Sequence, residues 1–238
     1  MEKVIYFMWR DPSADAEQFG KNLRGPLCDR LLAGDVRGLH VNIMDAAVAP
    51  AVGLRQINLW PQPEAFVSVW VDSAIDYLRR PVDDIVAAAA WRIAAYLVSE
   101  SMPIRNTRHQ PRPGQRTEGF SQIALLGRPP RLTPEQWRNI WQNSHTKVAI
   151  DTQSTFLYVQ NLVLRPLTYG APIIDALVEE GFPAAAMNDS QVFFDALGDE
   201  KKYQKNLDAM MESCNRFIDF DRIDVVPTSQ YVLKPVAA

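Results

Sequence analysis

Residues 5–43 read IYFMWRDPSADAEQFGKNLRGPLCDRLLAGDVRGLHVNI, and residues 123–161 read IALLGRPPRLTPEQWRNIWQNSHTKVAIDTQSTFLYVQN. The two stretches align without a gap at an offset of 118 (123 − 5). The identical pairs are Ile5/Ile123, Arg10/Arg128, Pro12/Pro130, Glu17/Glu135, Gln18/Gln136, Leu39/Leu157 and Val41/Val159. Self-similarity at a fixed offset indicates a repeated structural unit, so this alignment determines the architecture that we expect.

Each stretch predicts a strand followed by a capped helix. The apolar runs VIYFMW and SQIALLG end at an arginine and a proline-containing turn. Asp15 stands three residues before Gln18, and Thr133 three residues before Gln136, which is the spacing of a helix-capping box. Apolar residues then recur at helical spacing. One face of each helix should therefore pack on a sheet.

The remaining elements complete the order β-α-β-β-α-β in each half, which is typical of a ferredoxin-like module. We expect second strands at GLHVNI and FLYVQNLVL, where the residues alternate between two faces. Further strands are expected at residues 66–72, 94–101, 183–189 and 224–233, and helices at residues 73–91, 173–180 and 191–217, the last split at Gly198.

Residues 105–118, RNTRHQPRPGQRTE, are the expected linker between module 1–104 and module 119–238, because they are rich in Pro and Arg and contain no aliphatic residue. Helices cover one face of each antiparallel sheet, so the other face must be buried elsewhere. We therefore predict an α+β fold in which two tandem ferredoxin-like modules pack as an intramolecular dimeric α/β-barrel, with a space between the sheets. A further homodimer of two such chains is also consistent with the sequence.

Composition argues against several partners. The chain has 238 residues with 25 Lys plus Arg and 28 Asp plus Glu. Its net charge of −3 provides no positive electrostatic field that would attract a nucleic acid. The apolar run near the N-terminus is too short for a signal peptide or a membrane span. Cys28 and Cys214 show no C-x-x-C spacing, which favours a reducing compartment. We expect a cytoplasmic protein without nucleic-acid or membrane partners.

The sequence also lacks the common cofactor motifs. It contains no G-x-G-x-x-G, no G-x-x-x-x-G-K-[ST] and no G-x-S-x-G. Its histidines, His40, His109 and His145, show neither H-x-H nor H-x-x-x-H spacing. We therefore expect no cofactor and no metal.

His145 is the candidate catalytic residue. It follows Trp141 by four positions and Trp137 by eight, on the predicted sheet-facing side of the helix, whereas its counterpart in the first stretch is Leu27. Burial should lower the pKa of the imidazole below about 6.5 and leave a neutral base. Such a histidine can transfer protons. The alternative interpretation, a core histidine hydrogen-bonded to a carbonyl, is equally consistent with the sequence.

A second set of candidates lies on the predicted strand faces that point away from the helices. It comprises Tyr6, Arg10, His40, Asn42, Ser68, Trp70, Arg128, Tyr158 and Gln160. These residues form either a structural network in which every polar group is hydrogen-bonded or the lining of a water-filled pocket. Arg10 and Arg128 indicate either a repeated ion pair or anion sites. Residues 44–64 and 165–182 are candidate lids.

The stretch LTPEQWRNIWQNSHTKVA followed by FLYVQNLVL resembles the EthD-like family of the dimeric α/β-barrel superfamily. The first half departs from that pattern because it carries Leu27 where the histidine is expected. The resemblance implies paired ferredoxin-like modules and, for many members, cofactor-free cyclase, decarboxylase, isomerase or monooxygenase activity on hydrophobic compounds. It also implies His145 as catalytic acid or base with Trp141, Tyr158 and Gln160 as pocket neighbours, and it allows haem binding, since related barrels bind haem.

The resulting hypothesis is a cofactor-independent lyase, isomerase or cyclase that acts on a small hydrophobic, aromatic or polyketide-like substrate. His145 would abstract a proton, and Asn143, Tyr158 or Gln160 would stabilise the developing oxyanion. Trp137 and Trp141 offer flat rings beside a planar substrate, and His40 and Arg128 are additional binding candidates. Two alternatives stay open: a cofactor-free monooxygenase, and a non-catalytic protein that binds a small molecule such as haem.

Overall fold

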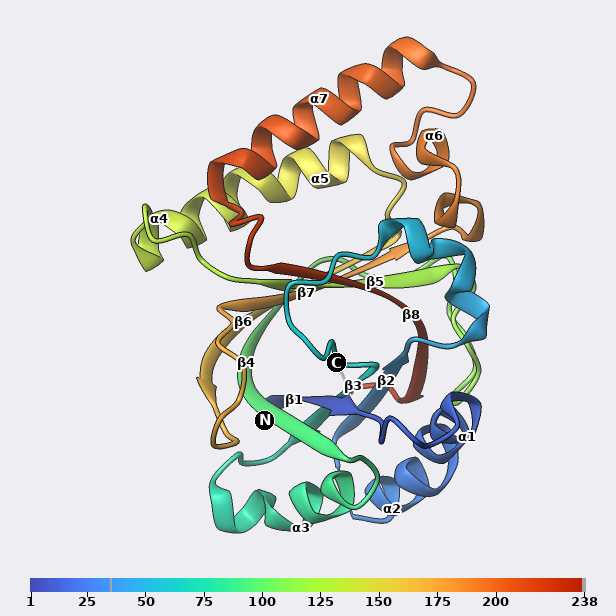
Figure 1. Cartoon of the computed structure of the whole chain (residues 1–238), viewed down its shortest axis with the longest axis vertical. Coiled ribbons are helices and arrows are strands. Elements are labelled where there is room, and N and C mark those ends of the chain that lie inside the picture. Colours follow the sequence, from blue (N-terminus) through green and yellow to red (C-terminus); the bar gives the residue numbers. More distant parts are fainter. Residues whose placement is uncertain (35, 237–238) are drawn as a thin grey trace.

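A computed structural model describes residues 1–34 and 36–236 (Figure 1). Within these residues, eight antiparallel strands close into a barrel in the order β1-β3-β2-β8-β5-β7-β6-β4. Their bounds are β1 (Glu2–Trp9), β2 (Gly38–Ile43), β3 (Ala65–Val71), β4 (Arg92–Ile104), β5 (Phe120–Leu126), β6 (Leu157–Pro166), β7 (Ala176–Phe182) and β8 (Ile223–Lys234). The fold is thus α+β with a closed antiparallel barrel.

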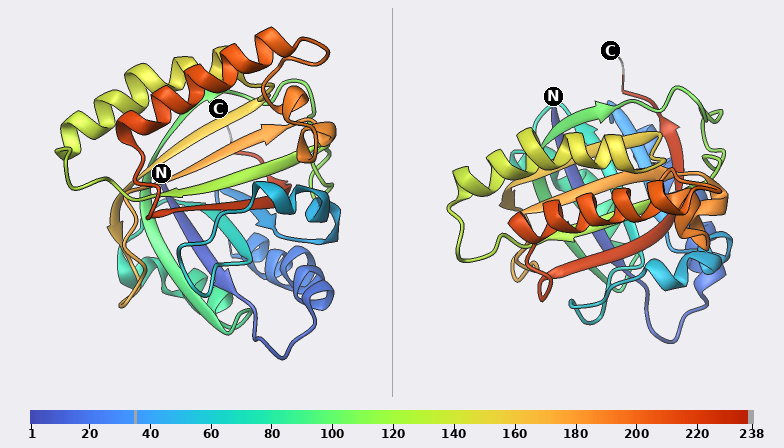
Figure 2. Two further views of the ribbon diagram at one scale, coloured as in Figure 1. Left: turned by 45° about the horizontal axis from the view of Figure 1, so that its top comes forward. Right: turned by 90° about the horizontal axis from the view of Figure 1, so that it is seen from above.

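Helices form a layer on each of two opposite sides of the barrel (Figures 1 and 2). The N-terminal half supplies α1 (Ala16–Asn22), η1 (Leu23–Leu27), α2 (Cys28–Ala33) and α3 (Asp76–Ala87) to one layer. The C-terminal half supplies α4 (Pro134–Asn139), η3 (Ile140–His145), α5 (Thr146–Thr152), η4 (Ala184–Met187), α6 (Ser190–Phe193) and α7 (Glu200–Phe217). The remaining helical segment of the N-terminal half, η2 (Ala46–Leu54), packs against η4 of the other half. In the described part of the chain, none of these helices combines the length and apolarity needed to cross a bilayer.

Two seams join the halves. The N-terminal half places its strands in the order β4-β1-β3-β2, and the C-terminal half repeats this order as β8-β5-β7-β6. Strand β2 pairs with β8, and β4 pairs with β6, both antiparallel. Because every strand has two neighbours, the barrel leaves no open sheet edge.

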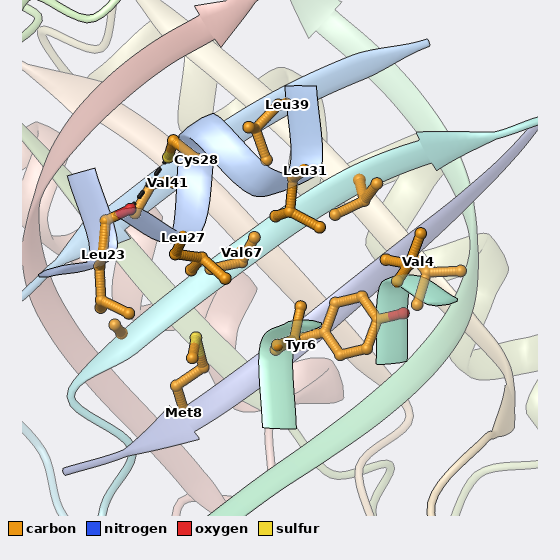
Figure 3. Close-up of a cluster of buried hydrophobic side chains, with 14 of the residues drawn as sticks. Val4, Tyr6, Met8, Leu23, Leu27, Cys28, Leu31, Leu39, Val41 and Val67 are labelled. Carbon is orange, nitrogen blue, oxygen red and sulfur yellow. Dashed lines mark hydrogen bonds between the residues drawn. The ribbon is translucent and has the colours of Figure 1, made fainter. Parts of the chain in front are cut away.

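The core under the N-terminal helices is densely filled. Figure 3 shows Tyr6 and Met8 of β1 on the same side of the sheet as Leu23 and Leu27 of the helix. The Tyr6 hydroxyl donates a 2.7 Å hydrogen bond to Asp83 Oδ1 on α3. The expectation that Tyr6 faces away from the helices is therefore wrong, and the ring fills the helix–sheet layer instead.

The main helix of each half contains one π-helical turn, η1 or η3, at equivalent positions. In each, the next residue bonds to a carbonyl five residues earlier: Cys28 Sγ donates to Leu23 O at 2.9 Å, and Thr146 Oγ1 donates to Trp141 O at 3.1 Å. These two donors are 118 residues apart (146 − 28). Such turns often mark functional sites, and here they end at Leu27 in one half and at His145 in the other.

The gapless alignment fails at the second strand. Leu39 packs under the N-terminal helices, but Leu157 lies on the opposite face of its sheet, and Tyr158 packs under the C-terminal helices. Helix α5 has seven residues against six in α2, which shifts the following strand by one position. A shift of one residue reverses the face of every side chain. Tyr158 and Gln160 therefore lie on the helix side, not between the sheets as predicted.

The third strand of the C-terminal half also differs from the sequence prediction. Residues 173–180 were predicted as a helix and residues 183–189 as a strand, whereas β7 covers Ala176–Phe182 and η4 forms a helical turn at Ala184–Met187. Strand β7 pairs with β5 and β6, and all its residues are buried. Burial on both faces hides the two-residue alternation on which strand prediction relies. Half of the predicted lid at residues 165–182 thus belongs to strands of the barrel.

The other predicted lid, residues 44–64, is anchored in place. The carboxylate of Asp224 on β8 accepts hydrogen bonds from the backbone N–H groups of Asn58 (3.1 Å) and Leu59 (3.0 Å) and from Nε2 of Gln62 (2.9 Å). Asp224 and Gln62 are both buried, whereas Asn58 and Leu59 lie nearer the surface. This segment forms a fixed wall against the C-terminal half.

Replacing Asp224 with alanine should lower the free energy of unfolding by roughly 2 to 4 kcal/mol, because one buried donor and two partly buried donors lose a charged acceptor. Urea unfolding followed by circular dichroism measures this change. The neighbouring exposed residue gives the control, and Asp221→Ala should leave the unfolding midpoint nearly unchanged. Equal stability of the two variants would contradict the anchoring role.

Candidate functional site

A cavity of about 540 Å³ lies between the sheet of the C-terminal half and its helices. Strands β5, β6, β7 and β8 form one wall, η3 and α7 the opposite wall, and the segment after η2 closes one end with η4 and α6. The sequence predicts a pocket between the two sheets, but Phe7, Tyr96 and Leu125 belong to an apolar cluster that fills part of that space. The cavity that His145 lines lies outside the barrel, and a separate hollow of about 590 Å³ is lined by strand residues that face away from the helices, including His40, Trp70 and Gln230.

Different side chains at equivalent positions of the two halves account for the cavity. Ala124 of β5 lines the cavity, and its counterpart at an offset of 118 is Tyr6, whose ring fills the N-terminal layer. Likewise, His145 lines the cavity where Leu27 is part of the packed core. Smaller and more polar side chains thus leave space in only one of the two helix–sheet layers.

His145 is held in a fixed orientation at the end of η3. Its ring is 8% exposed, its Nδ1 lies 2.9 Å from Ser213 Oγ on α7, and its centroid lies 4.6 Å from the ring of Phe217. Burial, aided by the nearby charge of Arg216, lowers the pKa of His145 from 6.5 to about 4. The imidazole is therefore neutral at physiological pH, as the sequence predicted.

Two adjacent glutamates on β7 occupy opposite faces of the sheet. Inside the barrel, Oε1 of Glu179 accepts hydrogen bonds from Asn42 Nδ2 (2.7 Å), Ser121 Oγ (2.8 Å) and Gln230 Nε2 (2.6 Å). Glu180 points the other way and lines the cavity, where its carboxyl group forms no hydrogen bond or ion pair with any residue that the structure describes. One carboxylate is structurally satisfied, and the other is available to a ligand.

Burial of Glu180 changes its acid–base chemistry. The side chain is 8% exposed, and loss of hydration raises its pKa from 4.5 to about 7. A carboxyl group with this pKa exchanges its proton readily at neutral pH. Burial and the nearby Glu180 carboxylate also raise the pKa of Cys214 to about 12 and that of Tyr158 above its usual range. Cys214 and Tyr158 consequently stay protonated beside the cavity.

The cavity brings together three of the residues singled out from the sequence. Trp141, His145 and Tyr158 line it directly. Gln160 stands behind them, because its Nε2 donates to Thr146 Oγ1 at 2.8 Å and to the Tyr158 hydroxyl at 3.3 Å. The sheet therefore positions Gln160 as a support for Tyr158.

The other aromatic and amide candidates lie elsewhere. Trp137 is buried beneath the helix, where its Nε1 donates to the carbonyl of Phe217 at 3.0 Å. Asn143 is on the exposed face of η3 and donates to Oδ1 of Asn139. Neither residue lines the cavity, so neither is placed to contact a substrate there.

The remaining candidates, His40 and Arg128, are also outside the cavity. His40 borders a second hollow near the linker, with its ring 4.7 Å from that of Trp70, and burial lowers its pKa to about 3. The Arg128 guanidinium donates to the carbonyl of Leu132 in its own turn, and Arg10 pairs with Glu64 at 3.0 Å. The two arginines thus have separate structural partners.

Glu180 was missed from the sequence because its segment was predicted as an amphipathic helix, in which a glutamate normally faces solvent. The available signal was a Glu-Glu pair within an otherwise apolar run, ALVEEGF. In a two-sided strand this pattern places one carboxyl group in each buried layer.

The cavity does not fit haem, which would need cations to pair with its two propionates. Among the residues that the structure describes, the lining includes no Lys or Arg, and it includes the acidic Glu180 and Asp189. The described residues also contain no cluster of three or more His, Cys, Asp or Glu side chains arranged for a metal ion.

This geometry, a closed antiparallel barrel between two helix layers, is the fold of the dimeric α/β-barrel proteins. The whole chain superposes on 94% of an anthrone oxidase-like protein with 8% identity and a TM-score of 0.54. It likewise covers 92% of a Fusobacterium nucleatum protein, provisionally named a monooxygenase, with 98% of its own length, 11% identity and a TM-score of 0.51. At these identities the likeness concerns the fold alone. No family model and no curated protein matches the chain.

The pKa of Glu180 predicts a pH-dependent stability. Between pH 4.5 and 7 the folded protein retains a proton on Glu180 that the unfolded chain releases, so stability falls as pH rises through this window. Glu180→Gln removes this dependence and should gain up to roughly 3 kcal/mol over the wild type above pH 7. Urea unfolding at a series of pH values measures the difference.

His145→Gln gives the matched comparison, because the effect of His145 on stability changes with pH in the opposite direction. The unfolded chain protonates this histidine below pH 6.5 while the folded protein resists until about pH 4, so the wild type loses stability as pH falls through that window. The variant's relative gain should therefore appear at low pH. Parallel pH profiles for the two variants would show that one of these groups is not buried as described.

Proposed function

We propose that this protein is a cofactor-independent enzyme that abstracts a proton from a small, planar, largely apolar substrate. The single observation that carries the proposal is the unpartnered Glu180 carboxyl group, with a pKa of about 7, in the helix–sheet cavity. A general base is most effective when its pKa lies near the operating pH. The surrounding Trp141, Tyr158 and Phe217 rings suit a flat apolar substrate.

The pKa values divide the roles of the two titratable groups. A base with a pKa of about 7 holds a proton roughly 1000 times more tightly than one with a pKa of about 4, so Glu180 rather than His145 is assigned as the base. We assign neutral His145 the tautomer in which Nδ1 accepts from the Ser213 hydroxyl, 2.9 Å away, and the proton is on Nε2. That N–H donates a hydrogen bond to the oxygen on which negative charge develops.

The reaction begins when Glu180 takes a proton from a carbon next to a carbonyl group, which leaves an enolate and a neutral carboxylic acid. Return of the proton to another carbon completes an isomerisation. Expulsion of a leaving group completes a lyase reaction, and attack on a carbonyl within the same molecule completes a cyclisation. All three use the same base and the same oxyanion donor.

A cofactor-free monooxygenase is the second candidate. Here the same enolate would react with O₂, and the fold neighbours named anthrone oxidase-like and monooxygenase favour this route at the level of fold. Oxidation of an anthrone to an anthraquinone consumes one O₂ and forms one water. A non-catalytic role, in which the cavity only binds the compound, would show tight binding without chemical change.

We also propose that the two halves are tandem ferredoxin-like modules, 1–104 and 119–238, joined by residues 105–118. Their equal strand order and the matching π-helical turns, with a side chain-to-carbonyl bond at the same offset, support a duplicated unit. The EthD-like resemblance belongs to the second unit. The first, with Leu27 and Tyr6, has no equivalent cavity residues.

Anthrone is a suitable first probe because it is planar, apolar and has an acidic C–H group. Under anaerobic conditions the wild type should catalyse exchange of that hydrogen with D₂O, measured by mass spectrometry, and the rate should rise with pH through about 7. Glu180→Gln should lower the rate by about 10² or more, and His145→Gln by a smaller factor. O₂ uptake under air then separates the oxygenase from the other reactions.

The adjacent glutamate provides the control for this experiment. Glu179→Gln keeps an oxygen that can accept from the barrel network, so it should reduce stability but preserve the exchange rate and its pH dependence. If Glu180→Gln exchanges as fast as the wild type, Glu180 is not the base.

A further inference from the structure

A third hollow, of about 650 Å³ and distinct from the one that His40 borders, is lined in part by residues of the linker. We call it the linker cleft. Its lining includes Arg105 and Arg108 from the linker and Ser154 after α5. Gln153 lines both the cavity and the linker cleft, and it is the one lining residue that the two share among the residues described. The two hollows therefore adjoin at Gln153.

The charges of the linker cleft complement those of the cavity. The guanidinium groups of Arg105 and Arg108 form no hydrogen bond or ion pair with any described residue. The acidic residue in the cleft lining, Asp195, is already paired with Lys202 Nζ at 2.8 Å. Two guanidinium groups thus remain available to an anion, whereas Glu180 and Asp189 in the cavity lining are acidic and would repel one.

Gln153 has the properties of a movable side chain between the two hollows. Its Oε1 is buried without a hydrogen-bond partner, and its carboxamide forms no hydrogen bond with any described residue. A buried unpaired carbonyl oxygen is costly, and a ligand N–H or O–H group would relieve that cost. Because no bond holds this side chain, it can turn aside for a flexible chain.

We propose that the substrate is an amphipathic carboxylate. Its planar apolar ring occupies the cavity, a short flexible chain passes Gln153, and its carboxylate binds the guanidinium groups of Arg105 and Arg108. Arginine binds carboxylates through paired, charge-assisted hydrogen bonds. The placement of the ring rests on the proposed function, but the recognition of the anion stands on the linker cleft itself.

Two probes that differ only at the end of the chain test this arrangement. 4-(1-Pyrenyl)butyrate and 4-(1-pyrenyl)butanol share a planar ring and a flexible chain, and only the first carries a carboxylate. Fluorescence titration should show that Arg105→Gln/Arg108→Gln weakens butyrate binding by about 10-fold or more and leaves butanol binding unchanged. The linker variant Arg112→Gln, whose side chain lines neither hollow, should bind both probes as the wild type does.

A third variant locates the ring. Cys214→Phe fills part of the cavity from α7 and should weaken both probes, with the melting temperature confirming that the variant is folded. The inference is overturned if the double arginine variant binds the butyrate normally or loses both probes equally. It is also overturned if a folded Cys214→Phe protein binds both probes unchanged. Binding needs no proton transfer, so inactivity of the cavity in the exchange assay would refute the proposed function and leave these results interpretable.

Discussion

Closure of the barrel is the constraint on which the rest of this structure depends. Pairing of β2 with β8 and of β4 with β6 gives every strand two neighbours, so each backbone ladder is satisfied without an exposed edge. Closure also seals an apolar interior around Phe7, Tyr96 and Leu125. With this part of the interior filled, the cavity of the C-terminal half lies outside the barrel, between a sheet and its helices.

Strand β7 shows how this arrangement separates structure from chemistry. It lies between β5 and β6, so both of its faces are covered, one by the barrel interior and the other by the helix layer. The alternation of side chains sends Glu179 to three donors and Glu180 to none. Burial without such donors favours the protonated form of Glu180 and raises its pKa. Glu179 therefore holds the barrel network together, whereas the Glu180 carboxyl group faces the cavity without a partner.

The two helix–sheet layers differ in the same way. In the N-terminal layer, Tyr6 bonds to Asp83 and packs with Leu27, so the space is full. In the C-terminal layer, Ala124 and His145 occupy the corresponding positions and leave a cavity. The fold supplies two similar layers, and a few side chains decide which of them can hold a ligand. This also explains why the overall fold, shared with distant proteins of differing names, does not fix the reaction.

The sequence by itself determined the elements with strong local signals. The capped helix at Thr133, the strand at GLHVNI and the burial of His145 with its lowered pKa all follow from short-range pattern and composition. Only the tertiary structure decided which face each strand of the C-terminal half presents, because one extra helical residue reverses the facing of Tyr158 and Gln160. It alone also revealed Glu180, since a carboxyl group acquires its pKa from the burial, the partners and the neighbours that distant segments provide.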